Sequence, residues 1–241
     1  MRLGESFFCI CYLIFLPVMG FILLRETFHD AKFVNLTDDF YRMAAFATFT
    51  LMLGDAFHLI PRVVSNIRGE GKKDEFFLGL GNLISSITMT VFYVLLYFAV
   101  YYASYPFYLD GVQDSLTSFY GLFRILIICL AVVRVALCCF PQNNWFRKEG
   151  NDKWSMIRNA PFLLLGLVMI VFLVLVYSKN ANGELPLSFI PGSRYFFMAV
   201  LIFLSFAFYI PVILWGRKKP SLGMFMIPKT ICYIILICLF H

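Results

Sequence analysis

The run from Met43 to Pro61 reads MAAFATFTLMLGDAFHLIP, and it decides the fold class. A transmembrane helix needs roughly 20 predominantly apolar residues to cross a bilayer, and this run has about that length. It also carries Asp55 and His58, three positions apart. A charged side chain deep in a membrane costs at least about 2.5 kcal/mol on insertion scales. The run therefore predicts a membrane helix whose polar stripe faces protein or a water-filled cavity.

The composition of the whole chain also indicates a membrane protein. Its 241 residues are 61% hydrophobic and 14% charged, whereas soluble domains are about half apolar and about a quarter charged. The formal net charge of +6 is interpreted as a bias in the loops of a polytopic protein, so we expect no nucleic-acid partner. The seven cysteines lack zinc-ligand spacing, and the three histidines are too scattered for a metal cage. We therefore predict neither a metal nor a cofactor.

Seven apolar runs are long enough to span a bilayer, and turn formers and charges separate them. We predict an all-α polytopic fold, a single transmembrane domain over residues 1–241 with seven helices. The expected spans are 6–24, 43–61, 76–102, 118–140, 160–178, 195–216 and 222–240.

Lysine and arginine predict the orientation. Twelve of the 20 lie on the N-terminal side of the spans, five lie on the other side, and three lie within spans. Because cytoplasmic loops carry the excess of these residues, we expect a cytoplasmic N-terminus and an external C-terminus.

Charged residues from three spans are expected at a similar depth. Asp55 lies seven residues before Arg62, or roughly 10 Å along an ideal helix. Arg134 precedes Pro141 by the same number, and Lys229 follows the basic end of the sixth span by ten residues, several of them in a loop. The three side chains are therefore predicted to meet in the cytoplasmic half of the bundle.

Uncharged polar residues are expected at the same level. In the third span, polar side chains recur every three or four residues from Asn82 and Ser86 to Tyr97, which places them on one helical face. Tyr209 of the sixth span also falls toward this end, whereas the fifth span shows no polar group and is expected to face lipid. We predict a pocket in which Asp55 and His58 form an acid/base couple, and the ligand-binding residues are Lys229, Arg134, Asn82, Ser86 and Tyr209.

The same residues have a purely structural interpretation. Asp55 with Lys229 or Arg134 is then a buried ion pair that fixes helix packing. The polar face of the third span is in that case a hydrogen-bonding surface between helices.

Three segments resemble the lysoplasmalogenase (YhhN-like) family of polytopic membrane hydrolases. LMLGDAF (51–57) is similar to its glycine-aspartate motif, FFLGLGNLISSITMTVFYVLLYF (76–98) to its next span, and MIPKTICYIILI (226–237) to its last. The resemblance implies that Asp55 is a catalytic acid. The family's mid-span histidine is replaced near Thr90, and its second aspartate would fall near Phe206. A weaker resemblance, to retinal-binding seven-helix proteins, depends on Lys229 and Thr230 and conflicts with the predicted orientation.

Three functions remain open from the sequence, and whether the protein is an enzyme is left undecided. The first is a lysolipid hydrolase-like protein, or an inactive relative, that binds a membrane lipid, an amphiphile or a small anion. The second is a transporter or sensor with a protonation-dependent Asp55/Lys229 pair. The third is a structural membrane protein without a ligand. The expected location is a membrane crossed several times, taken to be the plasma membrane of a bacterium.

Overall fold

The computed structural model describes residues 2–29, 36–68, 72–104, 118–146, 152–182, 192–215 and 219–241. Within these ranges the chain forms seven α-helices and two short 3₁₀ helices, and no strand. The α-helices are α1 (Arg2–His29), α2 (Leu36–Arg68), α3 (Lys72–Ser104), α4 (Phe119–Cys139), α5 (Asp152–Ala181), α6 (Gly192–Trp215) and α7 (Met226–Cys238). Each of the seven expected spans coincides with a helix long and apolar enough to cross a membrane. The predicted all-α, seven-helix fold is confirmed.

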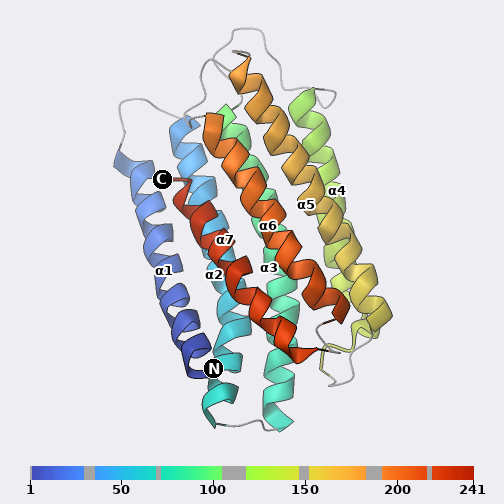
Figure 1. The fold of residues 1–241 in the computed structure, drawn as a ribbon. Coiled ribbons are helices and arrows are strands. Elements are labelled where there is room, and N and C mark those ends of the chain that lie inside the picture. The colour runs from blue at the N-terminus through green and yellow to red at the C-terminus, as the bar shows by residue number, and fades with distance from the viewer. Residues whose placement is uncertain are drawn as a thin grey trace.

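The helices form a closed bundle. Each packs against the next in the chain, and α7 returns to contact α1. In Figure 1, α1 and α2 stand on one side, α4 and α5 on the other, and α3, α6 and α7 lie between them. The N-terminus lies at the lower end of this view and the C-terminus toward the upper end. Which end faces the cytoplasm stays a prediction from the distribution of Lys and Arg.

The starts of α5 and α7 differ from the predicted boundaries in a way that affects the site. Helix α5 begins at Asp152, eight residues before the predicted start, so about two further turns belong to the helix. The seventh span starts as the 3₁₀ helix η2 (Pro220–Phe225), and its α-helix begins only at Met226. Pro220 occupies the first turn of η2, where its missing N–H is not needed.

The end of α4 is fixed by local hydrogen bonds. Pro141 stops the helix, because the residue before a proline is driven out of helical conformation. The short 3₁₀ helix η1 (Pro141–Asn143) follows. The Asn143 amide donates to the carbonyls of Leu137 at 2.7 Å and Phe140 at 2.8 Å. Trp145 donates from Nε1 to the Cys138 carbonyl at 2.9 Å, so the connection itself satisfies two terminal carbonyls of α4, those of Leu137 and Cys138.

Glycines allow α2 and α3 to approach closely. A Cβ on Gly81 of α3 would collide with the backbone carbonyl of Phe57 on α2, and a Cβ on Gly54 would collide with the Thr88 side chain. Small residues at such contacts are typical of packed membrane helices. The close approach places Asp55 and His58 next to the polar face of α3.

The fifth span was expected to face lipid, and this prediction is wrong. Phe162, Leu165, Met169 and Phe172 of α5 are buried in the core of the bundle. Apolar composition cannot separate a lipid-facing side from a core-facing side, because both are equally apolar in a membrane protein.

Candidate functional site

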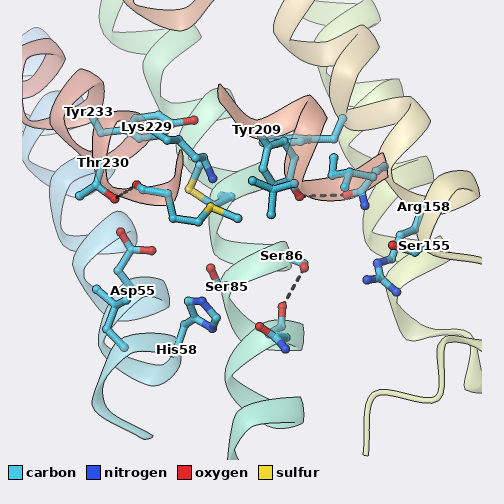
Figure 2. A pocket seen from close by; sticks show the side chains of 18 of the residues that line it. Asp55, His58, Ser85, Ser86, Ser155, Arg158, Tyr209, Lys229, Thr230 and Tyr233 are labelled. Atoms are coloured by element: carbon cyan, nitrogen blue, oxygen red, sulfur yellow. Dashed lines mark hydrogen bonds between the residues drawn. The ribbon is translucent and has the colours of Figure 1, made fainter. Parts of the chain in front are cut away.

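A cavity of about 270 Å³ lies between the helices. Asp55 and His58 of α2 stand on one side of it, and Ser155 and Arg158 of α5 on the other (Figure 2). The seven site residues predicted from the sequence all line this cavity: Asp55, His58, Asn82, Ser86, Arg134, Tyr209 and Lys229. The structure thus brings these residues together, while the roles assigned to them stay predictions.

Asp55 is held by a helix that the sequence did not implicate. The Tyr12 hydroxyl of α1 donates a hydrogen bond of 2.6 Å to Asp55 Oδ2. Tyr12 itself is 2% exposed. A single sequence gives no signal for this contact, because a tyrosine in an apolar span has many possible partners. The bond joins α1 to a cavity lined by the other six helices.

Lys229 enters the cavity from α7. Its Nζ lies 4.3 Å from the centre of the Tyr209 ring and 5.7 Å from that of Tyr233. Such cation–π contacts stabilise a partly desolvated ammonium group. Asp55 forms no ion pair with either of the described residues Lys229 and Arg134, so the expected direct pair is not present.

Arg134 is the most deeply buried charge of the cavity. It lies on α4 with 2% of its surface exposed, and its guanidinium carbon stacks 3.5 Å from the centre of the Phe162 ring. Among the described residues, its Nε and Nη1 have no hydrogen-bond acceptor. An unsatisfied buried donor is costly, and most such donors in folded proteins are paired. Two donors of a charged group therefore remain available inside the protein.

The first turns of α5 supply polar lining residues that the sequence prediction missed. They are Ser155, Arg158 and Asn159. Asn159 is 5% exposed and accepts a hydrogen bond of 3.2 Å from the Tyr209 hydroxyl. Their spacing of three and four residues indicates one helical face. The three residues were missed because they precede residue 160, where the apolar run of the fifth span was expected to begin.

The connection after α4 closes one side of the cavity. The Arg158 guanidinium lies 4.0 Å from the centre of the Trp145 ring and donates from Nη1 to Asn143 Oδ1 at 3.1 Å. Trp145 also lines the cavity. The hydrogen bonds that end α4 thus also position an aromatic ring and a cation at the site.

The polar face of α3 divides into two parts. Asn82 and Ser86 line the cavity, and the Ser86 hydroxyl donates to the Asn82 carbonyl at 2.7 Å (Figure 2). Further along, Tyr93 is fully buried, and its hydroxyl lies 3.1 Å from that of Tyr233. Tyr97 donates to the Tyr120 carbonyl at 2.6 Å. Only the first part of this face belongs to the cavity.

The described residues contain no group of three or more His, Cys, Asp or Glu side chains that could hold a metal ion. What the site offers is one carboxylate, three cationic side chains, amides, hydroxyls and aromatic rings. This donor set suits binding of a small polar molecule between helices.

The fold and the cavity define a class: a seven-helix membrane protein with a polar site inside the bundle. Comparison with family models is more specific. The model described as serpentine type 7TM GPCR chemoreceptor Srz matches residues 5–240, so the chain belongs to the Srz family of chemoreceptors. Searches of curated proteins and of solved structures found no match.

This membership corrects two expectations. The resemblance to the lysoplasmalogenase family is wrong, because the matched family spans nearly the whole chain and is a receptor family. The glycine-aspartate motif around Asp55 was too short to distinguish the lysoplasmalogenase family from the Srz family. The prediction of a membrane protein with several spans holds. The prediction of a bacterial plasma membrane is unsupported, because the Srz family is eukaryotic.

Proposed function

We propose that the protein is a chemosensory receptor whose ligand binds in the cavity between the helices. The observation that carries the proposal is that all seven helices meet this cavity. Helices α2 to α7 line it directly, and α1 reaches it through the Tyr12–Asp55 hydrogen bond. A ligand in this position contacts six of the seven helices directly and the seventh through Asp55 and Tyr12. It can shift the conformational equilibrium by the difference between its affinities for the two states.

The family description supports the same function and names its class of partner. A receptor described as a GPCR is expected to pass ligand occupancy to a G protein. Under this proposal Asp55 and His58 have a binding role instead of a catalytic one. Asp55 is hydrogen-bonded by Tyr12 in the structure.

The orientation of the bundle decides from which side the ligand arrives. The cavity lies in the half that holds the ends of α2 and α4 and the beginning of α5, and the positive charges predict that this half is cytoplasmic. With that orientation, an N-terminal epitope tag is detected only after cells are permeabilised, and a C-terminal tag is detected on intact cells. The reverse result places the cavity at the outer face.

The test of the ligand site is a stabilisation screen on the full chain in mild detergent. A library of small anions, cations and neutral compounds of similar size is added, and the melting temperature is measured. Because a bound ligand stabilises the folded state by mass action, compounds that bind raise the melting temperature. The screen is repeated with Ser86→Phe, which fills the cavity, and with Ser178→Phe at an exposed position of α5.

We expect a subset of compounds to stabilise the wild type and Ser178→Phe by a few degrees and to leave Ser86→Phe unchanged. If every stabilising compound acts equally on all three proteins, the cavity is not the ligand site. The family membership would be unaffected by that result, but the proposed site would be wrong.

A further inference from the structure

The charges around the cavity do not balance. Its lining residues include one acid, Asp55, and three cations, Arg134, Arg158 and Lys229. Inside a membrane protein, uncompensated charge is expensive, and intramembrane cations usually pair with an acid, a carbonyl or a ligand. Arg134 and Lys229 alone already outnumber Asp55, the one acid among the described lining residues.

The excess lies toward α4 and α5. Arg134 and Arg158 come from these two helices, whereas Asp55 belongs to α2. Asp55 already accepts a hydrogen bond from Tyr12, and no ion pair links it to either arginine within the described ranges. Among the described residues of α4 and α5 that line the cavity, none is acidic.

Arg134 has the geometry of a prepared anion anchor. Its guanidinium carbon lies over the Phe162 ring, 3.5 Å from the ring centre. A guanidinium already restrained by such a contact loses less conformational entropy when it binds a ligand. Its Nε and Nη1 have no acceptor among the described residues, although the side chain is only 2% exposed. A carboxylate in the cavity would supply an acceptor for either of these donors through a charge-assisted hydrogen bond.

The rest of the lining sets the size and polarity of the ligand. Leu59, Met89, Phe162 and Ile213 line the cavity beside the polar groups. A volume of about 270 Å³ is near the lower end of ligand pockets, which is roughly 300 Å³. These features fit a small molecule with one charged group and a short apolar part.

We propose that the receptor selects small organic monoanions, carboxylates with a short apolar chain or ring, and that Arg134 is the residue that anchors the carboxylate. This inference rests on the proposed function, because it names the ligand class of the same cavity. Lys229 and Arg158 contribute to the positive potential, and the apolar lining residues receive the chain or ring.

The experiment uses linear carboxylates of two to eight carbons and benzoate, each with its matched primary amide and matched amine. Binding to the full chain in mild detergent is measured by stabilisation and by direct titration. We expect that the compounds that bind the wild type but no longer bind Ser86→Phe are carboxylates. Each should bind at least about tenfold more tightly than its amide, since the amide lacks the charge-assisted interaction.

Variants of Arg134 test the anchor. Arg134→Gln should weaken carboxylate binding on the order of 10- to 100-fold, and Arg134→Lys should restore part of the affinity because it keeps the charge but not the planar fork. Arg42→Gln, in the exposed pair with Asp39, should leave binding unchanged. Should Arg134→Gln fail to fold, the carboxylate affinities of Arg134→Lys and the wild type are compared instead, and a lower affinity of Arg134→Lys supports the anchor.

The outcomes separate this inference from the proposed function. If amides or amines are the compounds lost in Ser86→Phe, the cavity is a ligand site but does not select anions, and the inference is wrong. If carboxylates bind but Arg134→Gln and Arg134→Lys both retain wild-type affinity, the anchor is wrong. If no compound distinguishes Ser86→Phe from wild type, the proposed function itself fails.

Discussion

Each long helix contributes to two different regions of the bundle, a closely packed aromatic half and a half that contains the polar cavity. In the half of the bundle remote from the cavity, Phe172 of α5 is fully buried. Its ring centre lies 5.0 Å from that of Tyr97 and 5.2 Å from that of Phe123. In the other half, Asn82 of α3 and Arg158 of α5 border an open cavity. One half is filled by packed aromatic rings, and the other contains the cavity and its charged side chains.

From this contrast we infer that the residues that stabilise the bundle and those that bind the ligand lie in different halves of the same helices. Aromatic pairs such as Tyr97–Phe172 hold the bundle together without help from the hydrophobic effect, which does not distinguish protein from lipid tails. The cavity half retains buried polar groups that a protein built only for stability would replace with apolar ones. Substitutions in the two halves should therefore have different consequences.

The largest loss of stability is expected from Phe172→Ala in the packed half. Removing a fully buried aromatic side chain from a core costs about 3–5 kcal/mol, so the melting temperature in detergent should fall steeply. Phe203→Ala is the matched control, because Phe203 is 62% exposed on the outside of the bundle. Equal melting temperatures for the two variants would contradict the division into a packed and an open half.

A smaller loss is expected from Gly81→Ala, at the approach of α2 and α3 beside the cavity. The added Cβ collides with the Phe57 carbonyl, and overpacking of this kind typically costs about 1–3 kcal/mol. Because the helices must separate, ligand affinity should fall together with the melting temperature. Gly4→Ala, where the added Cβ meets no atom within 4 Å, should retain both. A fully stable Gly81→Ala protein would show that the approach is looser than described.

The smallest effect is expected from Tyr12→Phe, which removes the hydrogen bond to Asp55. Side-chain hydrogen bonds between membrane helices contribute about 0.6 kcal/mol on average. A double-mutant cycle with Asp55→Asn measures this coupling through melting temperatures, and Tyr177→Phe at an exposed site is the control. A coupling energy of zero would mean that α1 is not energetically linked to the cavity.

The sequence predicted the fold and seven residues of the cavity lining because the membrane makes polar residues informative. Asp55, Arg134 and Lys229 were found because a charge inside a span needs a partner, and ideal helical rise placed them at one depth. Arg158 and Asn159 were missed because the hydropathy boundary fell at 160, although α5 begins at Asp152.

Other features depend on tertiary geometry that a single sequence does not contain. The 43-residue separation between Tyr12 and Asp55 leaves no periodic signal. The expected pairing of Asp55 with Lys229 or Arg134 is not formed, because similar depth does not fix which side chains are in contact. The family was also misjudged, since a seven-span count and a short motif around Asp55 are shared by unrelated classes of membrane protein.

The central claim is that the cavity between the helices holds the ligand. Its most direct test is photoaffinity labelling of the full chain with a diazirine derivative of the tightest-binding compound from the screen, followed by mapping of the labelled residues. The account predicts label on the cavity-lining segments of α2, α3 and α7, around Asp55, Ser86 and Lys229, and competition by the unmodified compound. Label confined to outward-facing residues such as Phe7 and Phe203, without competition, would contradict it.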